Sequence, residues 1–253
     1  MIPLLLAAAL ALPGSSPPGL SPPPGREAAT PCDRCAAAGR EPSGHYRAIL
    51  VRAAPGRLLE LIDGYKRQMN AIAAAGGERP YLMRHSQGDQ WDLMVLVPLE
   101  RNGGVGRRDE IPAFEETLDE LVAWREELLV KGPSPAALRE RMRGAGFYHI
   151  EMFLALPGKR DELLEQRRME NAYLHGIGRR ENLIFTREGG AAWDLFTLGA
   201  YRDIREFAGS ADIPAGLSDR AARQAGFEAA NRIGTYLRTL ISGHHDTLAV
   251  AVP

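Results

Sequence analysis

The chain has 253 residues, of which 45% are hydrophobic and 25% are charged, a composition typical of a folded globular protein. Its 31 basic and 32 acidic residues give a net charge of -1, which excludes broad electrostatic attraction to nucleic acid or to an anionic membrane. We therefore expect a local site for a small-molecule ligand, with no nucleic acid and no transmembrane span.

Residues 1–25 have the composition of a leader followed by a linker. Met1 to Leu12 is apolar over the length of a signal peptide and offers Ala9-Leu10-Ala11 for cleavage, although it has no basic n-region. It is too short to cross a bilayer. Pro13 to Gly25 is rich in Pro, Gly and Ser, as flexible linkers are. The sequence thus predicts an exported protein, periplasmic or extracellular, and the alternative is a retained low-complexity start.

Residues 26–45 form a lead-in that carries the only cysteines, Cys32 and Cys35. Attachment of a c-type haem needs a His after the second Cys, where Ala36 stands, and a structural zinc ion needs four ligands. A redox pair should open a helix after a strand. We interpret the pair as a local disulfide or as idle, and we predict no metal site.

The segment from Tyr46 to Pro98 recurs without a gap from Tyr148 to Ala200. The longer matches are Tyr46 with Tyr148, Pro55-Gly56 with Pro157-Gly158, Glu60-Leu61 with Glu162-Leu163, and Trp91-Asp92-Leu93 with Trp193-Asp194-Leu195. Such self-similarity indicates an internal duplication. We place the first copy over residues 46–146 and the second over residues 147–253.

In the first copy, Tyr46 to Ala53 is predicted to be a strand, and Pro55-Gly56 to open an amphipathic helix that ends at Gly76-Gly77. A hairpin follows, with strands at Tyr81 to Ser86 and Trp91 to Val97.

After a loop at Arg101 to Arg108, we predict a second helix from Pro112 to Gly132. Its apolar face would consist of Phe114, Leu118, Leu121, Val122 and Leu128. Ser134-Pro135 then caps a short helix that ends near Arg143.

The second copy is predicted to repeat this order. Its elements are a strand at Tyr148 to Ala155, a helix from Pro157 to about His175, a hairpin over Leu183 to Leu198, a long helix from Ser218 to Gly243 and a final strand within His244 to Val252. The repeat spacing places this final strand on Ala145 to Ile150. We therefore expect the fourth strand of the first copy to run straight into the first strand of the second.

Two β-α-β-β-α-β units give an α+β protein with two ferredoxin-like sheets, each covered by helices on one face only. The bare apolar faces of the two sheets must then pack face to face.

The two copies share a strand that ends in Pro-Gly-Lys/Arg, a helix that ends in a glycine turn, and a Trp in the hairpin. The residues are Pro55-Gly56-Arg57, Pro157-Gly158-Lys159, His175-Gly176, Trp91 and Trp193. On these residues, Tyr46 to about Pro253 resembles the dimeric α/β-barrel superfamily, and within it the NIPSNAP and EthD-like proteins. The resemblance implies two tandem ferredoxin-like units forming a dimeric α/β barrel. Members include monooxygenases, haem enzymes, lyases and proteins of unknown role.

Polar residues of the second copy replace apolar ones of the first, and a buried polar group is costly unless it is paired. Tyr65, Met69 and Ala73 become Arg167, Asn171 and His175 on one helix face, while Arg47 and Ile49 become His149 and Glu151 on one strand face. The alternative for both sets is ordinary pairing at a sheet edge or on a solvated rim.

His244-His245-Asp246 is a third candidate, because the last strand should lie beside the first, and its alternative is a solvated turn. We thus propose His175, His149 and Glu151 as catalytic candidates and Arg167, Asn171, Tyr148, His245 and Asp246 as ligand-binding candidates. The repeated Trp91-Asp92 and Trp193-Asp194 are interpreted as scaffold.

The leading hypothesis is an exported protein that binds an apolar or aromatic small molecule between the helices and the sheet of the second copy. Its enzymatic version is a cofactor-independent oxygenase or lyase with a His or carboxylate base, and whether a reaction occurs is left open. Haem is the alternative ligand, as in chlorite-dismutase-like proteins, with His175 or His149 axial and Arg167 distal. A third hypothesis is a non-enzymatic assembly module, in which one chain closes its barrel or two chains pair as a homo-oligomer.

Overall fold

The computed structural model describes residues 43–99 and 118–252. The leader, the pair Cys32 and Cys35, and the loop predicted at Arg101 to Arg108 lie outside the described residues, so those predictions stay predictions.

The elements follow in this order. The chain begins with β1 (Ser43–Ala53), α2 (Leu58–Ala74), β2 (Tyr81–Gln87) and β3 (Leu93–Leu99). It resumes with β4 (Val122–Pro133), α4 (Pro135–Met142), β5 (Phe147–Ala155), α5 (Arg160–Gly176), β6 (Leu183–Gly190) and β7 (Leu195–Tyr201). It ends with α6 (Ile204–Ala208), α7 (Ala215–Gln224), α8 (Ile233–Arg238) and β8 (Ile241–Ala251), and 3₁₀ turns lie at Asp119–Leu121, Gly209–Asp212 and Ala230–Arg232.

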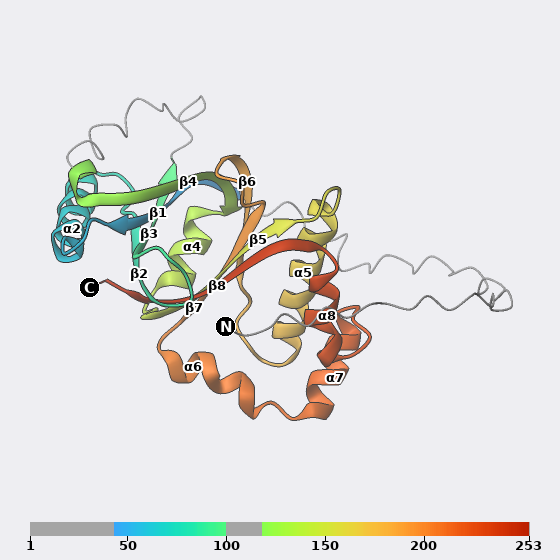
Figure 1. The fold of residues 1–253 in the computed structure, drawn as a ribbon. Coiled ribbons are helices and arrows are strands. Elements are labelled where there is room, and N and C mark those ends of the chain that lie inside the picture. Colours follow the sequence, from blue (N-terminus) through green and yellow to red (C-terminus); the bar gives the residue numbers. More distant parts are fainter. Residues whose placement is uncertain (1–42, 100–117, 253) are drawn as a thin grey trace, which may run out of the picture. The chain divides into compact units, whose positions relative to one another are not determined.

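The strands form one closed antiparallel barrel in the order β1-β3-β2-β8-β5-β7-β6-β4 (Figure 1). We call β4-β1-β3-β2 the first group and β8-β5-β7-β6 the second group. The groups are joined where β2 pairs with β8 and where β4 pairs with β6. A single chain therefore closes the barrel, and its strands leave no free edge.

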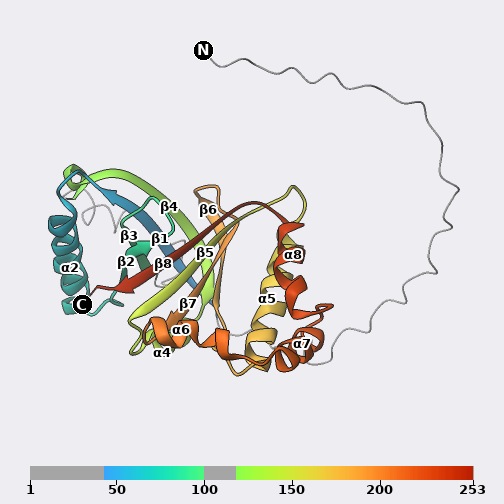
Figure 2. The same cartoon turned by 60° about the horizontal axis from the view of Figure 1, so that its bottom comes forward.

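Apolar side chains from both groups fill the barrel interior, among them Tyr46, Leu50, Met94, Ile150 and Phe196. Helix α4 contributes Leu138 and Met142 to this cluster. On the outside, α2 packs on the first group and α5 and α8 pack on the second, each with its own apolar cluster (Figure 2). β3 and β7 are thus covered on both faces, which explains their continuous apolar runs.

Most predicted elements of the first copy are confirmed. β1, α2 and the hairpin of β2 and β3 lie where the sequence placed them, and Ser134 caps α4 by accepting a hydrogen bond from the Ala137 N–H at 3.2 Å. The scaffold role of the repeated Trp-Asp pairs is also borne out. The Asp92 carboxylate accepts the Ala53 N–H at 2.8 Å, and the Asp194 carboxylate accepts the Ala155 N–H at 2.9 Å.

The predicted helix from Pro112 to Gly132 is wrong over its second half. Val122–Pro133 is β4, which pairs with β1 along its whole length, while Pro112 and Phe114 lie outside the described residues. Leu128 and Val130 point into the barrel, and Leu129 between them is 44% exposed. This alternation is a strand pattern, but the spacing of Leu118, Leu121, Val122 and Leu128 imitated a helix.

Two further expectations are wrong. The fourth strand of the first group is β4, so it does not run into β5 at Ala145 to Ile150. The long helix expected from Ser218 to Gly243 is split, because α7 ends at Gln224 and Gly226 has a φ of 95°. β8 begins at Ile241, so His244 and His245 lie within a strand, where neighbouring side chains point to opposite faces.

Two glycines allow the close approach of strands at the seams of the barrel. A β-carbon at Gly88 would overlap the carbonyl oxygen of Asp246 in β8, and one at Gly190 would overlap that of Glu127 in β4. Both glycines also have a positive φ, of 116° and 89°.

We predict that Gly190→Ala lowers the free energy of unfolding by about 3 kcal/mol, because strain at positive φ adds to a clash with backbone. Gly158→Ala is the matched control, since Gly158 has a φ of 76° but nothing within 4 Å of the added carbon. It should cost about 1 kcal/mol. Urea unfolding followed by circular dichroism measures both, and equal losses would contradict the close approach at the seam.

Candidate functional site

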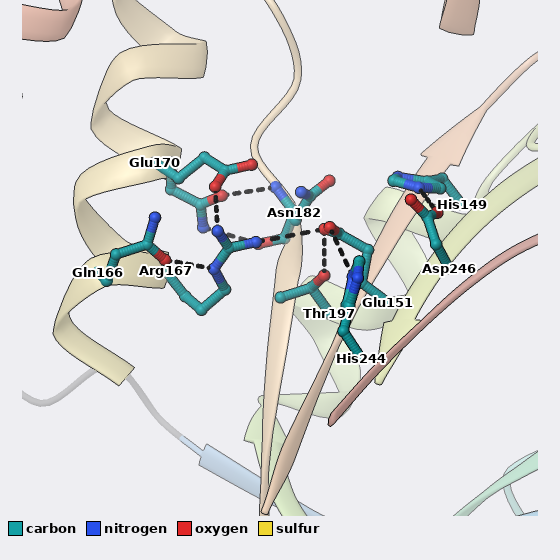
Figure 3. A network of polar contacts seen from close by, with 10 residues as sticks. His149, Glu151, Gln166, Arg167, Glu170, Asn182, Thr197, His244 and Asp246 are labelled. Atoms are coloured by element: carbon teal, nitrogen blue, oxygen red, sulfur yellow. Dashed lines mark hydrogen bonds and ion pairs between the residues drawn. The ribbon is translucent and has the colours of Figure 1, made fainter. Parts of the chain in front are cut away.

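The polar residues of β5 and β8 lie side by side on the outer face of the second group. Glu151 pairs directly with Asp246 across the two strands, and Phe153 pairs with His244. Opposite residues of an antiparallel pair share a face. His149, Glu151, His244 and Asp246 therefore point outward together, toward the side where α5 lies (Figure 3).

Glu151 is the buried centre of this group. Its Oε2 accepts hydrogen bonds from Thr197 Oγ1 of β7 at 3.0 Å and from Arg167 Nη1 of α5 at 3.4 Å. Its Oε1 lies 3.5 Å from His244 Nε2. Three elements thus converge on one carboxylate, which is only 8% exposed.

Arg167 fastens α5 to this carboxylate. Its side chain is 2% exposed, donates from Nε to Gln166 Oε1 at 2.7 Å, and forms an ion pair with Glu170. Its guanidinium also lies over the Phe153 ring, 4.8 Å from the ring centre. A buried charge needs such partners, because an unpaired one would be strongly destabilising.

Burial by itself raises the pKa of Glu151, because it penalises the charged carboxylate. The His244 imidazole 3.5 Å away, the charges of Arg167 and His149, and the hydrogen bond with Thr197 act in the opposite direction and hold its pKa well below the ordinary value. Glu151 is therefore ionised at neutral pH in spite of its burial.

His149 and Asp246 form a second pair at the edge of the group, through His149 Nε2 and Asp246 Oδ1. The His149 ring packs against Phe207 of α6, with ring centres 5.1 Å apart. Burial lowers the pKa of His149, but the hydrogen bond to Asp246 and the charge of Glu151 raise it, and the net pKa is raised. The Asp246 side chain is 55% exposed, so this pair is the end of the group that solvent reaches.

The first group carries a different set at the corresponding positions. Ile49 pairs with Glu127 across β1 and β4, as Glu151 pairs with Asp246 across β5 and β8. There, Arg47 donates two hydrogen bonds to Glu127, at 2.9 and 2.6 Å. A permanently charged guanidinium thus stands where the second group has the imidazole of His149.

The structure brings together His149, Glu151, Arg167, His244 and Asp246, but not the other predicted residues. Asn171 bonds the backbone of Asn182 through both ends of its amide, at 2.8 Å each. His175 has a side chain that is 81% exposed and lies 3.3 Å from Glu181. Both lie further along α5 than Arg167.

Tyr148 and His245 are on the opposite face of the sheet. Tyr148 belongs to the interior cluster, donates to the Ala145 carbonyl at 3.2 Å, and has a pKa raised by burial to about 12. His245 pairs with the inward-facing Met152 and lies 3.0 Å from the Asp89 carboxylate. Neither residue contacts Glu151 in the structure.

Thr197, Gln166 and Glu170 join the group although the sequence did not single them out. Thr197 replaces Val95 in the second copy, so the comparison of copies contained a signal for it. A Thr in a strand is too common to stand out by itself.

Side chains fill the space between α5 and the sheet, where a ligand pocket was expected. Phe153, Leu163, Gln166 and Arg167 are all at most 2% exposed. Two pockets in the described part of the chain lie elsewhere, one lined by Asp119, Trp124 and Arg125 and another by Arg57, Asp63 and Arg67. A ligand of the Glu151 group must therefore approach from the exposed Asp246 side.

One group of His, Asp or Glu residues in the described part of the chain is arranged as metal ligands are. Donor atoms of His149, Glu151 and Asp246 all lie within 4.8 Å of one another. Chemically, the group can share a proton between His149 and Asp246, accept a proton from a ligand, or bind a cation.

The solved structures most useful for comparison share the fold at low sequence identity. A candidate monooxygenase from Fusobacterium nucleatum gives a TM-score of 0.53 at 9% identity, over 85% of this chain and 94% of that chain. An anthrone oxidase-like protein gives 0.51 at 12% identity, over 85% and 93%. A candidate chlorite dismutase gives 0.50 at 14% identity, over 83% and 95%.

The chain has a dimeric α/β-barrel fold. The resemblance expected from the glycine turns and the hairpin Trp is therefore right at the level of the fold. Neither a protein-family model nor a curated protein matches the sequence. Among the helices within residues 43–99 and 118–252, none is both long and apolar enough to cross a bilayer.

We predict that Glu151→Gln lowers the free energy of unfolding by about 3 kcal/mol at pH 7, because it leaves the buried Arg167 with one partner fewer. Since the folded pKa of Glu151 is depressed, its contribution is complete above the ordinary pKa and is lost as the pH falls toward the folded value. The difference between wild type and variant should therefore shrink between pH 5 and pH 3.

Urea unfolding at pH 3, 4, 5 and 7 in the presence of EDTA measures this difference. Glu165→Gln on the same helix is the control, because Glu165 forms an exposed pair with Arg168, and it should change stability by less than about 0.5 kcal/mol. A difference for Glu151→Gln that stays constant with pH would show that the carboxylate is not held ionised by its neighbours.

Proposed function

We propose that the protein binds a small aromatic molecule with a polar group on the outer face of the second group, over His149 and Asp246. The observation that carries this proposal is the contrast between the two groups. Where the first group has Ile49 and a fixed Arg47–Glu127 ion pair, the second has a buried carboxylate and an imidazole that can gain or lose a proton.

The enzymatic form of this proposal is an oxygenase or lyase reaction that uses no cofactor. Asp246 engages Nε2 of His149 and thereby orients the ring, which leaves Nδ1 to accept a proton from an activated C–H bond of the ligand. Phe207, whose ring centre lies 5.1 Å from that of His149, supplies an apolar surface for an aromatic ring, and the buried Tyr201 packs against Phe207 with ring centres 5.3 Å apart.

For an anthrone, the balanced reaction consumes one O2 and releases one water. His149 takes a proton from the acidic methylene carbon, and the carbanion adds O2 to give a peroxide, which is protonated. Loss of water from the hydroperoxide then leaves the quinone, so the carbon is oxidised and O2 is reduced. The described structural neighbours, a candidate monooxygenase and an anthrone oxidase-like protein, support the choice of this chemistry.

Haem was the alternative ligand, but the residues of the second group do not fit a haem site. Of the two residues proposed as axial ligands, His175 is 81% exposed near the end of α5, and His149 is bonded through Nε2 to Asp246. Arg167, proposed as the distal residue, is buried in ion pairs with Glu151 and Glu170. In the described residues, the space between α5 and the sheet is occupied by side chains, so we derive no step through haem.

Two architectural statements belong to the same proposal. We infer that the barrel consists of two tandem ferredoxin-like units of NIPSNAP or EthD-like type, which the common strand order β4-β1-β3-β2 and β8-β5-β7-β6 supports. We also infer export, supported by the apolar segment Met1 to Leu12 and tested by the N-terminal mass of the secreted product.

We predict that EDTA-treated wild-type protein converts anthrone to anthraquinone above the uncatalysed rate. His149→Gln should lower this rate at least 100-fold, because it removes the base. His175→Gln is the matched control and should retain the wild-type rate. Oxygen uptake and quinone absorbance measure turnover.

The proposal fails in either of two cases. Wild-type protein that neither binds anthrone in a fluorescence titration nor consumes oxygen would reject the ligand class. Equal turnover by wild type and His149→Gln would reject the assigned base.

A further inference from the structure

We propose that His149, Glu151 and Asp246 form a binding site for a divalent transition-metal ion, with His244 beside Glu151. This inference goes beyond the proposed function, because it concerns a second kind of ligand for the same side chains. It stands or falls independently of any reaction.

The strand pairing builds the site from two short motifs. His149-x-Glu151 on β5 and His244-x-Asp246 on β8 run antiparallel, and the two carboxylates lie directly opposite each other. His149 lies diagonally across from Asp246, and His244 lies diagonally across from Glu151. Because alternate residues of a strand share a face, all four donors are presented on one side of the sheet.

The kinds of donor select the kind of ion. Imidazole nitrogen combined with carboxylate oxygen suits Zn²⁺, Fe²⁺, Co²⁺ or Ni²⁺ better than Ca²⁺ or Mg²⁺, which prefer oxygen ligands alone. Bonds to such ions are about 2.0–2.2 Å long, so the donors of one ion lie at most about 4.4 Å apart. The three donors here lie within 4.8 Å of one another, so side-chain movement on the order of 1 Å completes the site.

The surrounding residues hold Glu151 in a suitable orientation. Arg167 and Thr197 occupy its Oε2, which leaves Oε1 on the side of His244. His244 Nε2 is buried and has no hydrogen-bond partner within the described residues, although it lies 3.5 Å from Oε1. Its ring is stacked on Phe153 with centres 4.9 Å apart, so the nitrogen is held beside the carboxylate. Partners of this kind orient metal ligands in proteins.

The charges also favour a cation. Glu151, Glu170 and Asp246 are three carboxylates, and within residues 43–99 and 118–252 the ion pairs with these carboxylates include one permanent positive charge, that of Arg167. His149 and Asp246 are joined by a hydrogen bond, and a metal ion would take the place of its proton. In the first group, Arg47 occupies the position of His149 and cannot coordinate a metal ion.

Exposure increases across the site in the direction from which an ion would enter. The side chains of Arg167, Glu151, His149 and Asp246 are 2%, 10%, 17% and 55% exposed. The supporting residue is thus the most buried and one ligand faces solvent, which leaves a coordination position for water or for an oxygen atom of a bound molecule.

The experiment measures Zn²⁺ binding to EDTA-stripped protein by calorimetry and Co²⁺ binding by visible absorption. All proteins carry Cys32→Ser and Cys35→Ser, so that the Cys pair cannot bind the ion. The expected result is one Zn²⁺ per chain, a higher Tm with Zn²⁺, and a Co²⁺ spectrum of nitrogen and oxygen ligands. His149→Gln and Asp246→Asn should each weaken Zn²⁺ binding at least 10-fold, and His175→Gln should leave it unchanged.

Absence of stoichiometric Zn²⁺ and Co²⁺ binding would overturn the inference, and so would a His149→Gln variant that binds Zn²⁺ as tightly as the parent. The two surface variants are expected to fold, which far-ultraviolet circular dichroism checks. Because a metal-bound His149 has no free lone pair, bound Zn²⁺ should also stop the conversion of anthrone. Failure of Zn²⁺ binding alone leaves the anthrone result of the EDTA-treated protein intact, so the two proposals can fail separately.

Discussion

The closure of the barrel is the constraint on which the rest of the structure depends. Two separate four-stranded sheets would leave four edges with unpaired backbone groups, and the pairing of β2 with β8 and of β4 with β6 removes all four. β8 thus lies between β2 and β5. Its pairing with β5 places His244 and Asp246, which are almost a hundred residues from β5 in the sequence, opposite Phe153 and Glu151.

The second constraint is the neutralisation of charge beneath α5. Glu151 and Arg167 occupy positions where the first copy has Ile49 and Tyr65, both fully buried. The ion pair between them places charges in a layer that elsewhere is apolar, and its hydrogen bonds to Thr197, Gln166 and Glu170 compensate the loss of hydration. We propose that this buried network holds the side chains in position, and that the partly exposed pair of His149 and Asp246 contacts the ligand.

The sequence predicted the parts of the structure that depend on the repeat. Comparing the copies identified Glu151 and Arg167, because a polar residue at an apolar position of a known element needs a partner, and it identified His149 because this residue replaces Arg47 on the strand face of Glu151. It could not locate β4, since apolar residues in Leu118 to Leu128 fit either a helix or a strand until the pairing with β1 is known. It also missed the extra helices between β7 and β8, which shift the last strand out of the register of the repeat.

The sequence also could not show that two predicted site residues on α5 lie away from Glu151. Asn171 and His175 share a helix face with Arg167, but a helical pattern does not say where the helix extends past the sheet. Asn171 bonds the backbone before β6, and His175 faces solvent. His245 was expected at the junction before the last strand, but β8 begins at Ile241, so the alternation of the strand decides the face on which its side chain lies.

The central claim is that the second group differs from the first by a site that can exchange a proton or a metal ion. The most direct measurement is on the double variant His149→Arg with Asp246→Glu, which builds the Arg47–Glu127 pair of the first group into the second. The account predicts a Tm within about 5 °C of wild type, together with loss of both Zn²⁺ binding and anthrone conversion. A folded double variant that retains both activities would contradict it.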